Sequence, residues 1–87
     1  MARGSEVLFA VEAGNETAAE IADYLTRAGV PGLLTIETIG SVLRHLRTNG
    51  FVRYYTLDSK PTEYCYTVTA KGARKCSWWR GQGAEEP

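Results

Sequence analysis

The sequence predicts an α+β fold in which three helices are followed by a β-hairpin and a last helix. Residues 35–49 show the apolar periodicity of a helix, and residues 51–68 hold two short runs of aromatic and β-branched residues around a polar turn. The chain has 87 residues, which is enough for one domain. We expect this domain to span residues 1–80 and the Gly- and Glu-containing residues 81–87 to form a disordered tail.

Two helices are predicted before the periodic segment. Residues 5–13 form the first, with Ser5 as its N-cap and a Gly-Asn pair as its stop. The second opens on a capping box, in which the Thr17 hydroxyl accepts from the Glu20 amide while the Glu20 carboxylate reaches back. This helix is expected to end at about Ala28.

The connection over residues 29–34 is expected to be non-helical. Pro31 and Gly32 interrupt a helix there. Its three apolar side chains are expected to pack against the core; they are Val30, Leu33 and Leu34.

The third helix is expected to start near Thr35 and to end at Asn49-Gly50. At about 100° per residue, five apolar side chains share one arc of about 120°; they are Ile36, Ile39, Val42, Leu43 and Leu46. The opposite face holds Glu37, Ser41, Arg44 and Thr48, flanked by Thr38, Gly40, His45 and Arg47. An outer face of small polar and cationic residues suits insertion into a DNA groove, and it equally suits plain exposure to solvent.

The hairpin is predicted from residues 51–57 and 62–68, with the turn at residues 58–61. Alternation in the second strand places Tyr64, Tyr66 and Val68 on one face and Cys65 and Thr67 on the other. The tyrosines are expected to form cross-strand core pairs, with base stacking as the alternative. Thr69 is expected to cap a final helix from Ala70 to about Trp79.

Charge is unevenly distributed although the formal net charge is zero. Residues 1–43 carry two basic and six acidic side chains, a net charge of −4, whereas residues 44–80 carry eight basic and two acidic ones, a net charge of +6. We expect the basic segment to face phosphates. The alternative is that these are ordinary solvated side chains.

This order of elements resembles the winged helix-turn-helix transcriptional regulators, including the MarR-like and PadR-like groups. The resemblance covers the chain from about Ser5 to Trp79. Two motifs carry it: Ile39-x3-Leu43-x2-Leu46-x3-Gly50-Phe51-Val52 resembles the end of a recognition helix, and Tyr66-Thr-Val-Thr-Ala-Lys-Gly72 resembles the return strand entering the last helix. The resemblance implies that helix 35–49 enters the major groove and that hairpin 51–68 is the wing.

The same resemblance implies where DNA would be contacted. Arg44 would bind guanine, and Glu37 would accept a hydrogen bond from cytosine N4. Wing residues would contact phosphates or the minor groove. The candidate DNA-binding residues are Thr35, Glu37, Thr38, Ser41, Arg44, His45, Arg47, Arg53, Ser59 and Lys60.

These observations predict a small sequence-specific protein that binds double-stranded DNA and regulates transcription as a homodimer, either a repressor or a phage or plasmid accessory factor. Trp78 and Trp79 point about 100° apart on the last helix, so one is expected to pack inward and the other to contact the dimer partner. The alternative is that both pack within the monomer. The alternative function is a winged-helix protein-interaction module without DNA binding. We expect a cytoplasmic, nucleoid-associated location.

Catalysis, a cofactor and a metal are not expected. The sequence contains no Gly-rich phosphate loop, nucleophile elbow or paired carboxylates. His45, Cys65 and Cys76 cannot supply the four ligands of a structural zinc site. The two cysteines are expected to be buried free thiols, while a disulfide and redox sensing remain open. No apolar run approaches the length of a membrane span, and no secretory signal is evident.

Overall fold

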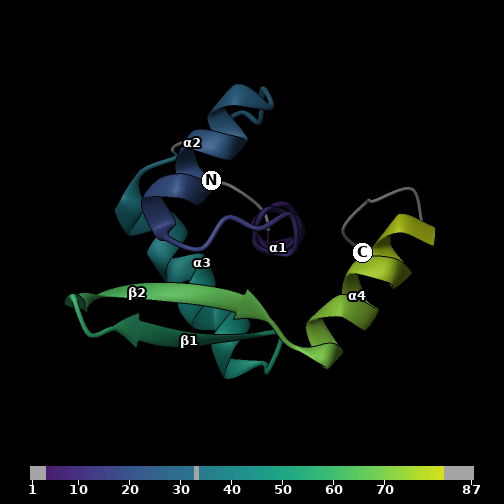
Figure 1. Cartoon of the computed structure of the whole chain (residues 1–87). Helices are drawn as coiled ribbons and strands as arrows, with labels where there is room; N and C mark the ends of the chain where they lie inside the picture. Colours follow the sequence, from purple (N-terminus) through teal and green to yellow (C-terminus); the bar gives the residue numbers. More distant parts are fainter. Residues whose placement is uncertain (1–3, 33, 82–87) are drawn as a thin grey trace.

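The computed structural model describes residues 4–32 and 34–81, in which four helices and one antiparallel hairpin form the fold (Figure 1). The elements are α1 (Gly4–Glu12), α2 (Ala18–Arg27), α3 (Ile36–Thr48), β1 (Val52–Leu57), β2 (Lys60–Val68) and α4 (Ala70–Gly81). The predicted α+β fold class is confirmed. Gly81 is the last residue of α4, and the rest of the predicted tail lies outside the described residues.

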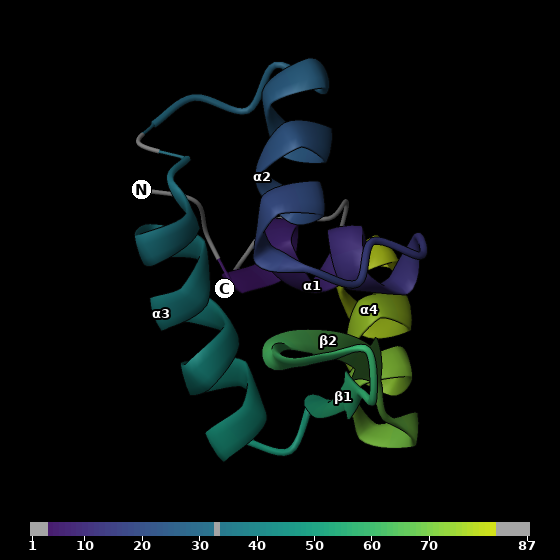
Figure 2. The same ribbon diagram turned by 60° about the vertical axis from the view of Figure 1, so that its left-hand side comes forward.

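The core forms around α1, which packs against α2, α3, α4 and β2 (Figure 2). Four apolar side chains of this short helix are buried, so it is apolar on most of its circumference, as a helix covered on several sides must be. The other elements supply the remaining buried side chains of this core cluster: Ile21, Leu25, Ile39, Leu43, Leu46, Val52, Cys76 and Trp79.

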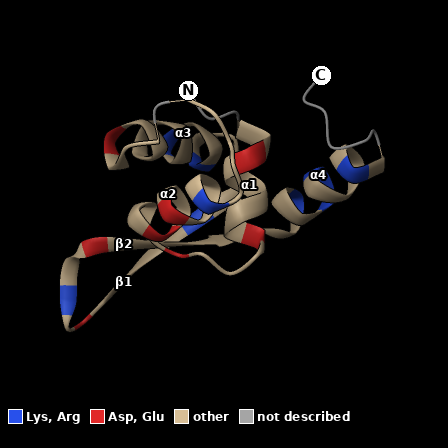
Figure 3. Cartoon of the chain, turned by 90° about the horizontal axis from the view of Figure 1, so that it is seen from above, with Lys and Arg blue, Asp and Glu red and all other residues tan. Residues whose placement is uncertain are grey.

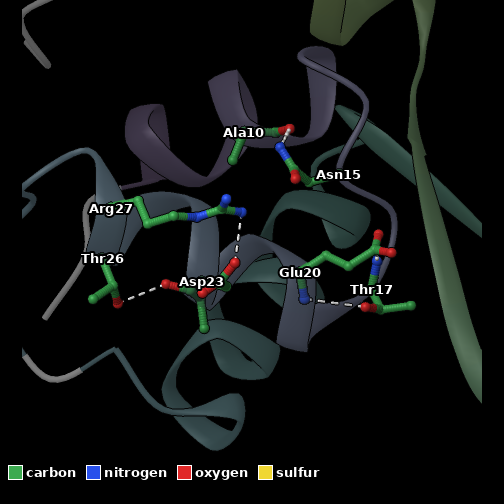
Figure 4. A network of polar contacts seen from close by, with 8 residues as sticks. Ala10, Asn15, Thr17, Glu20, Asp23, Thr26 and Arg27 are labelled. Carbon is green, nitrogen blue, oxygen red and sulfur yellow. Dashed lines mark hydrogen bonds and ion pairs between the residues drawn. The ribbon is translucent and has the colours of Figure 1, made fainter.

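Capping boxes begin both α2 and α3. The Glu20 amide donates to Thr17 Oγ1 at 3.1 Å, and the Glu20 carboxylate accepts from the Thr17 amide at 3.3 Å (Figure 4). At α3, the Thr38 amide donates to Thr35 Oγ1 at 3.2 Å and the Thr35 amide donates to Thr38 Oγ1 at 3.1 Å. These bonds satisfy amides that have no partner inside the helix, which fixes both helix starts. The predicted starts of these two helices are confirmed.

Two predictions about single residues in the helices were wrong. Ser5 is not an N-cap: α1 begins at Gly4, and Ser5 lies in its first turn with 1% of its surface exposed. Packing in the core has outweighed the capping preference of serine.

Ile36 was placed on the apolar arc of α3 but is 61% exposed. It lies at the edge of the arc and in the first position of the helix, beside an open hollow that also borders the start of α2. In the preceding connection, Val30 and Leu34 pack on the core as expected, while Leu33 lies outside the described residues.

The hairpin turn is shorter than predicted. Leu57 pairs with Lys60, so only Asp58 and Ser59 form the turn, and Lys60 and Pro61 belong to β2. A two-residue connection is the commonest for a hairpin. The strand register shifts between Thr56, which pairs with Tyr64, and Leu57, which pairs with Lys60, and this shift makes the short turn possible.

One backbone hydrogen bond joins the outer edge of β2 to the segment between α1 and α2. The Tyr66 amide donates to the Glu16 carbonyl at 2.7 Å. Within the described residues the sheet has two strands, so this bond partly satisfies an otherwise unpaired edge and holds the base of the hairpin against the helices.

The start of α4 is tightly fitted to the start of β1. The Gly72 amide donates to Thr69 Oγ1 at 3.0 Å, which is the predicted cap, and Thr69 Oγ1 donates to the Gly50 carbonyl at 2.6 Å. Gly72 is buried directly beside the Phe51 carbonyl. This contact sets the direction in which α4 leaves the hairpin.

Candidate nucleic-acid interface

The outward face of α3 is polar and free of overlying segments among the described residues. Glu37, Ser41, Arg44 and Thr48 are all exposed on it. Ser41 Oγ donates to the Glu37 carbonyl at 3.2 Å, and Thr48 Oγ1 donates to the Arg44 carbonyl at 3.0 Å. Each hydroxyl proton is therefore used inside the helix, while the oxygen lone pairs remain available to an outside donor. The structure brings together the predicted residues Glu37, Ser41 and Arg44.

The predicted residues Thr35, Thr38 and His45 have different surroundings. Thr35 and Thr38 form the capping box, and Thr38 Oγ1 also donates to the Thr35 carbonyl at 3.0 Å. Their hydroxyls are thus engaged in starting the helix. His45 is exposed, and helical periodicity places it on the flank shared with Thr38, away from Arg47.

Arg47 stacks on an aromatic cluster of the hairpin. Its guanidinium carbon lies 4.7 Å from the centroid of the Tyr54 ring. Tyr54 packs edge-to-face against Tyr64, with ring centroids 5.0 Å apart, and lies 6.5 Å from Tyr66. Tyr54 and Tyr64 are about half exposed, so these tyrosines are not the core pairs that the sequence suggested. A cation held over an aromatic face is attracted by the ring quadrupole, so this stack links α3 to the hairpin.

A groove of about 430 Å³ runs between α3 and the hairpin, and we call it the α3–wing groove. One wall is the exposed face of α3 and the other is formed by two tyrosines of β2. The lining residues are Glu37, Gly40, Ser41, Arg44, Arg47, Tyr64 and Tyr66. Two cations and one carboxylate line it, so the groove favours an anion at its Arg44 and Arg47 end.

The predicted wing residues lie apart from one another. Ser59 is in the exposed turn, and Lys60 starts β2, where its Nζ lies 3.8 Å from a carboxylate oxygen of Glu63. Arg53 lies in a separate hollow with Glu16 and Tyr55, on the hairpin face opposite Tyr54. The structure therefore does not bring Arg53 together with the arginines of α3.

The basic segment does not face in one direction (Figure 3). Half of its eight basic residues are on α4, and two of these have a hydrogen-bond or ion-pair partner in the chain. Lys71 Nζ donates to the Asn49 carbonyl at 2.8 Å, and Arg80 forms an ion pair with Glu12 of α1. The basic side chains of this segment therefore do not share one face, because α4 turns away from α3 toward α1. The positive charge beside the outward face of α3 comes from Arg44 and Arg47.

The tryptophan pair divides between the core and the surface. Trp79 is 4% exposed and packs edge-to-face on Phe9 of α1, with ring centroids 6.0 Å apart. Trp78 is 46% exposed, and Lys75 Nζ lies 4.6 Å from the centroid of its ring. One tryptophan thus packs inward as predicted, and only Trp78 is available to another molecule.

Both cysteines are buried free thiols, as expected. Burial raises the pKa of the Cys65 thiol above its ordinary value, and burial together with the nearby Glu12 raises the pKa of Cys76 to about 11. Because the thiolate is the reactive form, these pKa values disfavour redox sensing at neutral pH.

Residues 4–32 and 34–81 hold no group of three or more potential metal ligands. Among the same residues, no helix has the length and apolar character needed to cross a membrane.

Comparison with known proteins relates this geometry to solved structures. No protein-family model matches the sequence, and no curated protein matches it. The chain superposes on Streptococcus pneumoniae FabT in complex with DNA, with a TM-score of 0.74, 12% identity, and coverage of 93% of this chain and 52% of that one. A mutant of S. aureus MepR gives a TM-score of 0.74 at 17% identity, covering 97% and 59% of the two chains. Bacillus subtilis PadR in complex with operator DNA gives 0.71 at 20% identity, covering 88% and 45%.

These similarities define the fold as a winged helix-turn-helix, in which the β1–β2 hairpin is the wing. The predicted fold is thereby confirmed over nearly all of the chain. The chain spans about half the length of these three proteins.

Proposed function

We propose that this chain binds double-stranded DNA sequence-specifically and regulates transcription, with α3 in the major groove and the β1–β2 hairpin as the wing. The observation that carries the proposal is the exposed, polar outward face of α3, which presents Arg44 beside Glu37 and Ser41. Support comes from two structures of the same fold, FabT and PadR, that were solved with DNA.

The chemistry of this face matches base edges of the major groove. The Arg44 guanidinium can donate two hydrogen bonds to O6 and N7 of one guanine. The exposed Glu37 carboxylate, two turns earlier, can accept from the amino group of a cytosine. Ser41 lies between them and presents an oxygen acceptor, because its proton is already donated to the Glu37 carbonyl.

Phosphate contacts would hold the protein in register on the duplex. Arg47 is exposed at the wing side of α3, and Lys60 is exposed at the wing tip. Both are side chains that neutralise phosphates without reading sequence. Each neutralised phosphate releases counterions, so binding should weaken as salt rises.

The proposal includes a homodimer formed through the surface around Trp78. A two-fold dimer would place two α3 helices on half-sites about one helical turn apart, roughly 34 Å. A large exposed aromatic side chain is favoured at interface centres. Sedimentation equilibrium should show a dimer, and Trp78→Ala should shift it toward monomer. The control is Tyr24→Ala, which removes an exposed aromatic ring from α2. Equal dimerisation of both variants would place the interface elsewhere.

DNA binding is tested by incubating the purified protein with mixed genomic fragments at two salt concentrations and sequencing the bound fragments. Enrichment of one inverted repeat is expected, with weaker binding at the higher salt. Arg44→Glu should abolish binding to that repeat, whereas Arg74→Glu, a charge reversal on exposed α4, should weaken it far less. Unchanged binding by Arg44→Glu would show that this face is not the reading surface. Absence of binding even at low salt would favour the protein-interaction alternative.

A further inference from the structure

Gly40 lies in the middle of α3, although packing does not require a glycine there. A Cβ atom built at this position meets nothing within 4 Å, in contrast to Gly72, where it would collide with backbone. A glycine inside a helix costs about 1 kcal/mol of stability relative to alanine. The recognition helix therefore carries a destabilising residue that its own fold does not need.

Gly40 is also the point where two hollows of the surface meet. The α3–wing groove lies on one side, and a second hollow of about 450 Å³ lies on the other. The two share Gly40, Tyr64 and Tyr66. The second hollow is lined by Thr17, Ala18, Ala19, Ile36, Gly40, Thr62, Glu63, Tyr64 and Tyr66. Together they form one trough between α3 and the hairpin, from the start of α2 past Gly40 to Arg44 and Arg47.

Each end of this trough holds groups that attract negative charge. Arg44 and Arg47 provide two guanidinium groups at one end. At the other end are Ala18 and Ala19, the first two residues of α2, whose amides belong to the group that has no carbonyl partner inside a helix. The partial positive charge of a helix N-terminus adds to these donors. An extended anion that lies along the trough would thus meet a favourable group at each end, but the Glu20 carboxylate of the capping box and Glu63 weaken the attraction at the α2 end.

DNA bound by a helix and a wing supplies such an anion. A helix in the major groove and a hairpin in the neighbouring minor groove lie on two sides of one sugar–phosphate strand. That strand has to pass between α3 and the hairpin, where the trough is. Resting on the proposed function, we propose that the trough seats one sugar–phosphate strand and that Gly40 is the residue whose missing side chain lets this strand approach the backbone of α3.

Acidic residues near the trough limit where phosphates can lie. Glu63 lines the second hollow, with its carboxylate 3.8 Å from Lys60 Nζ, and Glu37 lines the α3–wing groove two turns before Arg44. Phosphates would be repelled from both. The closest phosphate approach is therefore on the stretch between Gly40 and Arg47.

The experiment compares Gly40→Ala and Gly40→Leu with the wild-type chain and with Gly81→Ala. Gly81 is the matched control, because it lies in a helix with nothing within 4 Å of its built Cβ and is remote from α3. Thermal unfolding should show that both Gly40 variants are at least as stable as the wild type, since alanine and leucine favour helices. Their affinity for the enriched DNA fragment should fall in order of size, by at least about tenfold for leucine, equivalent to about 1.4 kcal/mol.

Neither Gly40 substitution removes a charge, so the salt dependence of binding should keep its wild-type slope. Gly81→Ala should bind as the wild type does. Wild-type affinity in Gly40→Leu would overturn the role of Gly40 in DNA binding while leaving the proposed function intact. A lower unfolding temperature in both Gly40 variants would also overturn it, because the glycine would then be needed for the fold. Absence of DNA binding by the wild type would instead remove the proposed function on which the inference rests.

Discussion

Gly72, in the first turn of α4, is a position where a single added methyl group should strongly destabilise the fold. The Cβ of Gly72→Ala would lie 2.0 Å from the Phe51 carbonyl oxygen and 2.7 Å from Val68 Cγ2. Ordinary contact between carbon atoms needs about 3.5 Å. The start of α4 must therefore move away from β1 by more than about 1 Å, because the first obstacle is backbone and not a flexible side chain.

The cost of this movement can be worked out from the contacts around Thr69. Forced overpacking costs about 1–3 kcal/mol. The movement also strains the hydrogen bonds that join Thr69 to Gly50, Phe51 and Gly72, each worth about 1 kcal/mol. The better helix propensity of alanine returns about 1 kcal/mol. We expect a net loss of about 2–4 kcal/mol in the free energy of unfolding, or about 10–25 °C in Tm for a domain of this size.

Thermal and urea unfolding followed by circular dichroism measure this loss. The matched control is Gly81→Ala, the same substitution at the other end of the same helix, where the built Cβ has open space. The control should unfold within about 1 kcal/mol of the wild type. If Gly72→Ala has the same free energy of unfolding as Gly81→Ala, the close packing of α4 against β1 is refuted.

Three further predictions concern the cap of α2, the tyrosine beside it and the trough. Thr17→Ala removes the hydroxyl that accepts from the Glu20 amide and should lower the free energy of unfolding by about 1 kcal/mol in urea titrations, whereas Thr26→Ala, which removes a hydroxyl that only bonds back within the same helix, should change it less. The hydrogen bond from Tyr55 to the Glu16 carboxylate raises the pKa of Tyr55 to about 12. Because the folded state favours the neutral phenol, this bond stabilises the fold below pH 10 and its contribution is lost as the pH rises from 10 to 12. Phenolate absorbance should therefore show a tyrosine titrating near pH 12 that disappears in Tyr55→Phe, and an unchanged titration would contradict the bond. Glu63→Gln removes a carboxylate from the trough and should strengthen DNA binding at low salt, measured by fluorescence anisotropy. Equal affinity would mean that phosphates do not pass near Glu63.

Much of the fold could be predicted from the sequence because its signals are local. The capping box of Thr17 and Glu20, the apolar arc of α3 and the glycine after Asn49 each act over a few residues, and the structure has them where they were expected. The errors arose where distant packing decides. Ser5 is a good cap residue that the core buries, and the two-residue turn depends on a cross-strand register that residues 58–61 do not specify.

The candidate site could be predicted only in part for the same reason. Helical periodicity was sufficient to place Glu37, Ser41 and Arg44 on one outward face. The stacking of Arg47 on Tyr54 joins residues from two elements, so no spacing in the sequence reveals it. The two parts of the sequence do differ in charge, but this difference does not place the basic side chains on one face. Charge counted along a chain contains no information about the direction in which α4 leaves the hairpin.

The ion pair between Glu12 and Arg80 has a consequence for the order in which the molecule folds. Its two residues are 68 positions apart, and with Phe9 and Trp79 they hold the first helix against the last. Closing so long a loop costs more conformational entropy than joining α2 to α3, so we expect the docking of α4 to follow the assembly of the three preceding helices. The last contacts to form are often the first to open, and α4 amides should therefore exchange with solvent faster than those of α3. Cys76, a fully buried residue of α4, would then report each opening through its rate of alkylation, while Cys65 reports on the hairpin.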